Sequence, residues 1–439
     1  MVKNITKNNI KVLLTYPEYE EISHYGANKR KEIPPFGVLY LATAARMKNA
    51  EVTVLPIKLC MPIEKYNLED YEIVAMSIPS SVTYSIVKDF ISKAKFGNNT
   101  LKIVGGIHAT LFPHNVLEEL NVDIVSIGEG EITLQEIIDN YPLKIYKNIK
   151  GILYKENNKI ITTEKRPLEE NLDVFGFPAR ELLSDEYIVM NRLSDTNIKM
   201  AHIMCSRGCP NKCAFCCNLD RNIRYRSGKH VKKELEYLIQ TYGIKGFCII
   251  DDNFIMNNSK VLDIIDNISS LNLKWSALSR INGINEYILK KAKQAGCIEI
   301  KYGVESGSQE ILNKMNKKIT IEEIIKTITL THDLGIKTKI FLIHGFPGEN
   351  IKTTEETIEL LKKLKDKIDR ISLFRFTPLP GSDVYVNPKK YDIIVPENFD
   401  DLYIYNNQNI YWGTENDKRE IDESYSLLSN YIMSVWGKL

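Results

Sequence analysis

The feature that most constrains the fold is a regular alternation of short β-rich runs with helical patterns over residues 10–140. The runs are rich in valine and isoleucine, and intervening stretches such as VLYLATAARMKN at 38–49 and TYSIVKDFISKAKF at 83–96 space apolar residues three or four apart. Because helices cover both faces of a parallel sheet, this alternation predicts a doubly wound, Rossmann-like α/β domain. The expected strands are residues 11–17, 52–56, 72–79, 101–106 and 122–128.

Glycine-rich groups follow two of these strands. Gly105 and Gly106 come after one strand, and the segment Gly128–Glu131 comes after another. Ligands of a doubly wound sheet bind beyond the carboxyl ends of its strands, so a ligand site is expected at this edge. The second group also has a purely structural interpretation, in which Gly128 ends the strand and Glu131 places negative charge at a helix N-terminus.

A second series of strands and helices begins near residue 200. Six βα units predict a partial (βα)6 TIM-type barrel, because a closed eightfold barrel usually takes ~250 residues. Polar groups rich in glycine and proline follow the strands, at the end where such barrels carry their active residues. The expected strands are residues 201–204, 246–250, 274–279, 298–303, 338–345 and 370–376.

The 439 residues suit two or three domains. We expect a Rossmann-like domain over 1–145 and a hairpin and linker over 146–197. The turn-prone ENNK within GILYKENNKIITT (151–163) marks the hairpin. The partial barrel is expected over 198–388. A short C-terminal extension over 389–439 is expected to end in a helix over 423–436.

Charge, apolar content and cysteine usage argue against several classes of protein. The net charge is only +2, which gives no reason to expect a nucleic-acid partner. No apolar run approaches the ~20 residues of a membrane span. Eight cysteines, five of them bunched, do not resemble the disulfide framework of a secreted protein. The sequence therefore predicts a reduced, cytoplasmic protein.

The five bunched cysteines lie in CSRGCPNKCAFCC, residues 205–217. Only Cys209, Cys213 and Cys216 are separated by gaps of three and then two residues. Thiolates suit iron–sulfur clusters and zinc, and three of them leave one iron of a [4Fe–4S] cluster open. Zinc is the alternative, but zinc motifs usually combine two paired ligand sets and no second CxxC or HxxxH follows. Cys205 and Cys217 fall outside the triple and are interpreted as ordinary small buried residues.

This spacing, with Phe215 before the third cysteine, resembles the CxxxCxΦC loop of the radical SAM superfamily. GVESGSQEILNKMNK (303–317), GFPGE (345–349) and TPLPGSDVY (377–385) resemble later motifs of that family, in the same order. The resemblance implies a cluster whose open iron chelates S-adenosylmethionine (SAM), with one electron cleaving the sulfonium to give a 5′-deoxyadenosyl radical.

The resemblance also implies which residues bind SAM. Glu305 is expected to reach the ribose hydroxyls, and Arg280 to meet the methionyl carboxylate, although a structural salt bridge remains open for Arg280. Many family members carry GGE after the second barrel strand, where this chain has DDNF, so the ligand of the amino group is open. The expected SAM-binding residues are Phe215, Asp252, Arg280, Glu305, Gly345, Pro347 and Pro380.

The first domain resembles the cobalamin-binding domain of one branch, the class B radical SAM methyltransferases, at residues 34–42, 77–80, 104–113 and 122–137. The chain lacks the DxHxxG motif, whose histidine binds cobalt in mutases. His108 is the nearest candidate ligand, with a local hydrogen bond as its alternative role. A domain that keeps the fold without holding the corrin also remains open. The expected cobalamin-binding residues are Ser77, Gly105, Gly106, His108, Gly128 and Glu129.

The implied function is cobalamin-dependent radical SAM methylation of an unactivated carbon in a small molecule. The alternative is a dehydration, cyclisation or rearrangement on the same architecture, with or without cobalamin. A non-enzymatic iron–sulfur carrier is a third hypothesis, but it would have no use for SAM-binding motifs. An electron donor such as flavodoxin or ferredoxin is the expected protein partner. The sequence names neither the substrate nor the catalytic acid or base.

Overall fold

The computed structural model describes residues 9–18, 33–58, 67–191, 193–194, 196–395, 399, 412–413 and 415–437. The chain divides into two compact units. Unit 1 comprises Met1–Glu169, Val174–Tyr187 and Asn398–Tyr405, and unit 2 comprises Glu170–Asp173, Ile188–Glu397 and Asn406–Leu439. Within the described ranges, no helix is both long enough and apolar enough to cross a membrane.

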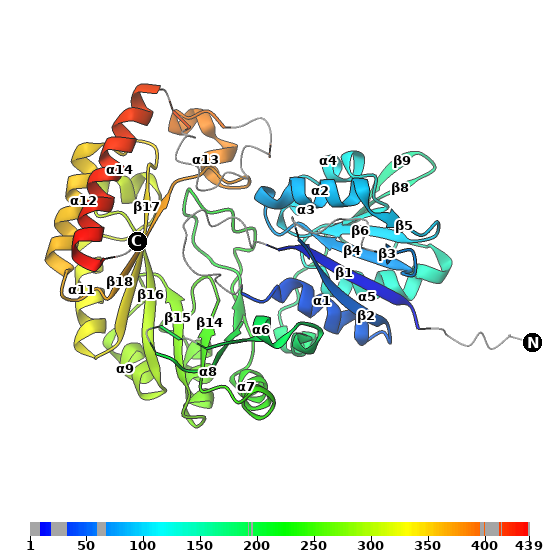
Figure 1. The fold of residues 1–439 in the computed structure, drawn as a ribbon, viewed down its shortest axis with the longest axis horizontal. Helices are drawn as coiled ribbons and strands as arrows, with labels where there is room; N and C mark the ends of the chain where they lie inside the picture. Colours follow the sequence, from blue (N-terminus) through cyan, green and yellow to red (C-terminus); the bar gives the residue numbers. More distant parts are fainter. Residues whose placement is uncertain are drawn as a thin grey trace, which may run out of the picture. The chain divides into compact units, whose positions relative to one another are not determined.

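Unit 1 is built on a seven-stranded sheet in the order β2-β1-β4-β6-β7-β8-β9 (Figure 1). The first five strands are parallel, and β8 and β9 continue the sheet as an antiparallel hairpin. The chain moves outward from β1 in both directions, as in a doubly wound fold, so the predicted fold class is confirmed. The strands are β1 (Lys11–Pro17), β2 (Glu51–Ile57), β4 (Ile73–Ser77), β6 (Leu101–Gly105), β7 (Ile124–Ser126), β8 (Ile152–Glu156) and β9 (Lys159–Thr162).

Helices cover both faces of this sheet, so its strands are buried on both sides. On β1, Val12 and Leu14 belong to one apolar core, whereas Leu13 belongs to the other. This follows from the twofold side-chain alternation of a strand. Helices α1 (Phe36–Arg46) and α5 (Glu131–Asn140) contribute to the first core, and α2 (Tyr84–Lys93) and α4 (Pro113–Glu119) to the second.

Two local details differ from the sequence expectation. The predicted hairpin is present, but it joins the sheet of unit 1, where β8 pairs with β7, instead of standing apart. The helical pattern read over 83–96 ends at Lys93, because Lys95–Phe96 forms strand β5 beside β3 (Asn67–Leu68). In both places a long-range strand pairing decides the structure, and such pairings are invisible to a local pattern.

Unit 2 is built on a second seven-stranded sheet, in the order β10-β11-β14-β15-β16-β17-β18. Six consecutive strands are parallel, and only β10 is antiparallel, so the predicted six βα units form an incomplete barrel. The strands are β10 (Val189–Met190), β11 (Met200–Ile203), β14 (Gly246–Ile249), β15 (Lys274–Ser279), β16 (Cys297–Glu305), β17 (Lys337–His344) and β18 (Arg370–Arg375). The paired strands β12 (Ser206–Arg207) and β13 (Arg224–Tyr225) lie outside this sheet.

Figure 1 shows most of the helices of unit 2 on the outer side of its curved sheet, whereas the short α13 (Asp383–Val386) lies apart from that side. Several begin at side-chain caps, such as Thr320 and Glu323 in the capping box of α11. The last helix, α14, extends the expected 423–436 segment toward the N-terminus. The helices are α7 (Gly228–Tyr242), α8 (Ser259–Ser269), α9 (Glu286–Gln294), α10 (Gln309–Lys314), α11 (Ile321–Asp333), α12 (Ile351–Leu364), α13 (Asp383–Val386) and α14 (Glu415–Trp436).

Candidate active site

The cysteine loop lies between β11 and α7 and is anchored through Ala214. The amide of Ala214 donates to the carbonyl of Met315, and its carbonyl accepts from the amide of Val384. These two partners follow β16 and β18, respectively. Ala214, Met315 and Val384 also belong to one buried apolar cluster, against which Phe215 packs. The fold therefore fixes the loop at the carboxyl ends of the barrel strands.

The three thiols of the predicted triple are free, and none is in a disulfide. The Nη1 of Arg280 donates to Cys213 Sγ at 2.9 Å, and the side-chain amide of Asn211 donates to Cys209 Sγ at 3.4 Å. Burial raises the pKa of the Cys216 thiol to about 11. No three metal-ligating side chains in the described part of the chain converge on a single ion. A cubane does not require such convergence, because each thiolate binds a different iron.

Two adjacent aspartates after β14 hold the beginning and the end of the cysteine loop. Asp251 accepts from the Cys205 amide at 2.8 Å and from Ser206 Oγ at 2.5 Å, and burial raises the Asp251 pKa to about 7. Asp252 accepts from the side-chain amide of Asn218 at 2.8 Å. Sequence reasoning selected Asp252 and missed Asp251, although Asp251 directly follows the expected strand 246–250.

Lys317 joins the other two charged residues of the site, and sequence reasoning missed it. Its Nζ lies 2.6 Å from Glu305 Oε1 and 5.6 Å from the centre of the Phe215 ring. Its carbonyl accepts a hydrogen bond from Arg280. Lys317 is only 3% exposed, and Glu305 is 8% exposed. Burial against a predicted ligand-binding carboxylate marks Lys317 as a candidate functional residue. This burial is not visible in the sequence, so sequence reasoning could not find it.

The backbone around Glu305 leaves room for this ion pair. A Cβ on Gly303 would lie 2.5 Å from Glu305 Oε1 and 3.0 Å from Lys317 Nζ, so any larger residue would displace the pair. Glu305 has a backbone φ of 70°, which residues other than glycine rarely adopt. Such strain is maintained where the surrounding structure requires a particular geometry, which is typical of functional sites.

The turn after β17 is organised around a buried carboxylate. Glu349 accepts from the amides of Gly345 at 2.6 Å and Phe346 at 3.3 Å. Burial raises the pKa of Glu349 to about 8. Pro347 of this turn and Pro380 after β18 are also buried. These residues shape the end of the barrel, and Glu349 is a further residue that the sequence interpretation did not select.

In unit 1, three adjacent strands end in small residues. Ser77 ends β4 and pairs in register with Gly105 at the end of β6, and Ser126 ends β7. The buried hydroxyl of Ser126 has no hydrogen-bonding partner within the described chain. Gly106 has a φ of 102°, and a Cβ there would lie 2.5 Å from the Ile78 carbonyl oxygen. An edge of small residues with an unpartnered hydroxyl fits a large, flat ligand that approaches the strand ends.

His108 lies beside this edge, within an aromatic cluster. Its Nδ1 is 2.8 Å from Ser81 Oγ, and its ring contacts Tyr84, Phe112 and Phe399 at centroid distances of 4.5, 5.1 and 4.7 Å. The side chain is fully buried, and burial lowers its pKa to about 4. The structure thus places His108 in the local hydrogen bond that the sequence left open as an alternative to cobalt ligation.

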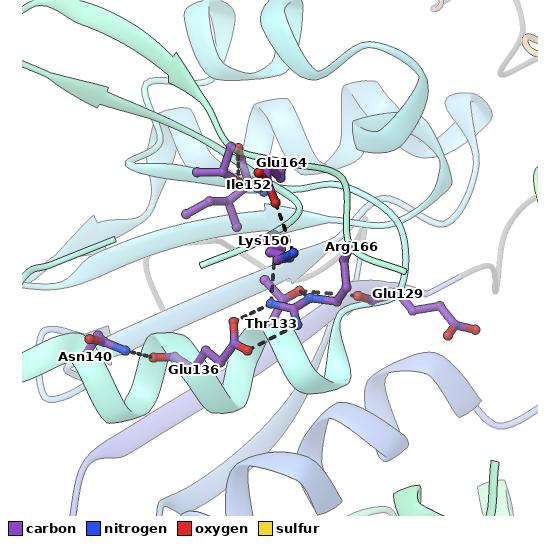
Figure 2. Close-up of polar contacts among 9 residues, drawn as sticks. Glu129, Thr133, Glu136, Asn140, Lys150, Ile152, Glu164 and Arg166 are labelled. Atoms are coloured by element: carbon purple, nitrogen blue, oxygen red, sulfur yellow. Dashed lines mark hydrogen bonds and ion pairs between the residues drawn. The ribbon is translucent and has the colours of Figure 1, made fainter. Parts of the chain in front are cut away.

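The loop Gly128–Gly130 leads directly into α5, and Arg166 fixes this helix (Figure 2). Arg166 Nε donates to Thr133 Oγ1 at 2.9 Å, its guanidinium pairs with Glu136, and its Nη2 donates to the Lys150 carbonyl at 3.0 Å. In Figure 2 the carboxylate of Glu129 points away from this cluster. The amide of Gly128 is held by Thr110 Oγ1 at 2.9 Å.

Two family models match the chain. The model of the radical SAM superfamily matches residues 203–361, and the model of the B12 binding domain matches residues 23–138. An uncharacterized methyltransferase of Pyrococcus horikoshii is 31% identical over 369 residues, which cover 80% of this chain and 78% of the relative. The chain belongs to the B12-binding branch of the radical SAM superfamily. Its cofactors are therefore a [4Fe–4S] cluster, SAM and cobalamin.

One further relative and one solved structure are also similar to this chain. The anaerobic magnesium-protoporphyrin IX monomethyl ester cyclase of Cereibacter sphaeroides is 27% identical, over 64% of this chain and 48% of that protein. The solved structure of the radical SAM methyltransferase TsrM from Kitasatospora setae, with cobalamin and a [4Fe–4S] cluster bound, has a TM-score of 0.67. At 17% identity, covering 89% of this chain and 80% of TsrM, this likeness establishes the shared fold.

Proposed function

We propose that this radical SAM enzyme methylates an unactivated carbon of a small-molecule substrate. The observation that carries the proposal is the chain of contacts from Cys213 through Arg280 and Lys317 to Glu305. It brings the cysteine loop together with two charged groups suited to a zwitterionic nucleoside ligand. The methyltransferase relative and the B12-binding domain support methyl transfer as the outcome.

When bound, the cluster and SAM supply one-electron hydrogen abstraction, and cobalamin supplies the methyl group. Cys209, Cys213 and Cys216 would hold the cluster; Cys213 is buried and the other two are partly buried. Arg280 already donates to the Cys213 sulfur and has further N–H donors for a ligand carboxylate. The fork of donors on a guanidinium suits that carboxylate.

Glu305 would accept hydrogen bonds from the ribose hydroxyls through the oxygen that Lys317 does not hold. Phe215, Asp252, Gly345, Pro347 and Pro380 complete the proposed SAM surface. In unit 1, Ser77, Gly105, Gly106, Gly128 and Glu129 would line the cobalamin edge, together with the unpartnered hydroxyl of Ser126. His108 would support this edge from beneath, held in its hydrogen bond to Ser81.

The chemistry requires an electron donor, for which a flavodoxin or a ferredoxin is proposed. All the described cysteines are free thiols. Free thiols and a low-potential donor fit a reducing compartment such as the cytoplasm.

The test uses full-length protein reconstituted anaerobically with iron, sulfide and cobalamin. We expect about four irons for each chain, a cobalamin absorption spectrum, and 5′-deoxyadenosine from SAM and a reductant. With SAM labelled on its methyl group, the label should appear in the product of a substrate found by screening. Bound corrin and 5′-deoxyadenosine formation without label transfer to any converted substrate would contradict methylation.

The cyclase relative favours a second candidate, a ring closure or rearrangement without methyl transfer. The same labelling experiment separates the two candidates. A converted substrate whose product mass changes by loss of hydrogen or water, with no labelled methyl group, would support the second candidate.

A further inference from the structure

The inner face of the curved sheet in unit 2 differs from its outer face. On β16 and β17, the outer side chains Ile300, Tyr302, Ile340 and Leu342 are at most 1% exposed. The residues between them are partly exposed, which produces a strict alternation along β17. Phe374, on the inner side of β18, is 37% exposed. The inner face is therefore not closed over by apolar packing.

Cationic residues gather on this inner face. The strand register aligns Glu299 with Lys337, Lys301 with Lys339, and Lys339 with Arg370. Lys301 Nζ lies 3.2 Å from Cys248 Sγ, although strand β15 lies between their two strands in the sheet. Both side chains must therefore project from the same face of the sheet, the inner one. On β16, β17 and β18 the inner positions therefore carry the cations Lys301, Lys337, Lys339 and Arg370 against two acids, Glu299 and Glu305. Both acids are already paired, Glu299 with Arg370 and Ser194 Oγ, and Glu305 with Lys317.

Apolar rings lie next to these charges. The rings of Phe341 and Phe374 have their centroids 6.0 Å apart, and Lys339 Nζ lies 4.9 Å from the centre of the Phe341 ring. Leu278 and Ile343 on the same face are partly exposed. A surface that combines exposed rings with ammonium groups is complementary to a molecule with an apolar body and a negative head group.

We propose that this inner face binds an organic anion, with its carboxylate or phosphate at Lys301 and its apolar body on Phe341 and Phe374. Only one part of the proposal rests on the proposed function, namely that the bound anion is the substrate of the enzyme. Lys301 precedes Glu305 by four residues, or about 13 Å along a strand. An anion held at Lys301 thus has space for its body between the head group and the proposed SAM site.

Lys301 has the bonding capacity that this role requires. Its ammonium group has three donors, and in the described part of the chain its hydrogen-bonding partner is the Cys248 thiol, a weak acceptor. The side chain is partly buried, so an anion beside it is partly shielded from water. A charge-assisted hydrogen bond in such surroundings stabilises a bound anion more strongly than one formed in open solvent.

The first experiment measures binding to the reconstituted full-length enzyme without reductant, so that turnover plays no part. The probes are anilinonaphthalene sulfonate, an aromatic anion that fluoresces on binding, and its neutral relative phenylnaphthylamine. We expect Lys301→Met to raise the Kd of the anionic probe at least about tenfold. Lys301→Arg should stay near wild type, as should the matched control Lys363→Met on the exposed side of α12.

The neutral probe provides the control for shape. Its Kd should be the same in wild type and Lys301→Met, whereas Phe341→Ala should weaken both probes. An unchanged Kd for the anionic probe in Lys301→Met would overturn the proposal. An equal loss for both probes in that variant would also overturn it, because the lysine would then contribute packing and not charge.

Competition distinguishes the two head groups. Phenylbutyrate and phenyl phosphate are each titrated against the bound anionic probe, and the stronger competitor identifies carboxylate or phosphate as the preferred group. Failure of both to displace the probe would overturn the proposal. These readings are independent of 5′-deoxyadenosine formation, so loss of the proposed function and loss of this anion site give different results.

Discussion

The strand ends of unit 1 carry small residues, whereas those of unit 2 carry charged side chains in direct contact with one another. In unit 1 the edge is formed by Ser77, Gly105 and Ser126, and the nearby His108 is buried in an aromatic cluster. In unit 2 the corresponding edge holds Arg280 and Glu305, with Lys317 between them. Parallel sheets with helical crossovers support both arrangements.

This difference indicates two kinds of recognition. Small residues allow a bulky, flat ligand to approach the backbone, so the binding proposed at the edge of unit 1 would depend mainly on shape. Fixed charges recognise a small zwitterion by its ionic groups, so the binding proposed in unit 2 would depend on electrostatics. Substitutions should therefore act through steric exclusion in unit 1 and through charge in unit 2.

The largest effect is expected from removing the negative charge of Glu305. Glu305→Gln removes the proposed ribose acceptor and leaves Lys317 buried without a counter-ion. 5′-Deoxyadenosine formation should fall at least about a hundredfold, and the free energy of unfolding should drop by about 3–5 kcal/mol. Enzyme assays and denaturant titration, with iron content as the check on the cluster, measure both.

The double variant Glu305→Gln/Lys317→Met separates the two roles of this carboxylate. Removing the unpaired cation should restore most of the stability without restoring activity. If the double variant regains activity together with stability, Glu305 acts only as a structural partner of Lys317.

In unit 1 the largest expected effect is steric. Gly106→Ala would place a Cβ 2.5 Å from the Ile78 carbonyl oxygen at a φ of 102°. We expect a loss of about 3 kcal/mol in stability and reduced cobalamin content, with iron content unchanged. Gly37→Ala, in a helix where a Cβ would meet nothing within 4 Å, is the matched control. It should be neutral or stabilise unit 1 by up to about 1 kcal/mol.

A smaller effect is expected for Lys317→Met. The carboxylate of Glu305 would remain but lose the partner that orients it, so KM for SAM should rise about tenfold with a smaller change in kcat. Lys317→Arg should recover part of this loss. Lys318→Met, at the exposed neighbouring position, is the control. A uniform loss of stability with unchanged KM would mean that Lys317 contributes only to folding.

The smallest effect is expected on the pH dependence of the stability of unit 1. Burial lowers the pKa of His108 to about 4, below its ordinary value of 6.5. The unfolded chain therefore binds the proton more readily, and stability is lost as the pH falls below about 6.5. Between pH 6.5 and 5.5 this histidine should account for about 1 kcal/mol. Denaturant titrations of wild type and His108→Gln should show a shallower pH dependence in the variant.

Much of the fold was predictable because it follows from local periodicity. Strand β1 begins and ends where the sequence predicted, and the six parallel barrel strands occupy their expected segments. The cysteine triple was recognisable because cluster ligation demands a fixed spacing along one loop. The hairpin was recognised as well, but its place in the first sheet was not, since pairing with β7 depends on residues distant in sequence.

The charged contacts of the site were less predictable for the same reason. Lys317 is one of many lysines in the sequence, and only folding shows that it is buried against Glu305. Asp251 and Asp252 are adjacent in the sequence, and only the hydrogen bonds to Cys205 and Ser206 reveal that Asp251 anchors the cysteine loop. The roles of Lys317 and Asp251 depend on their burial and on partners distant in sequence, which a local sequence pattern does not show.

The central claim is that Cys209, Cys213 and Cys216 hold the cluster that starts the reaction. The most direct test is iron content and 5′-deoxyadenosine formation after single alanine substitutions, with the buried Cys297→Ala as control. Each substitution within the triple should leave the protein folded but abolish 5′-deoxyadenosine formation, and should remove most of the iron, while the control keeps both. Full iron content with undiminished 5′-deoxyadenosine formation in any of the three variants would contradict the account.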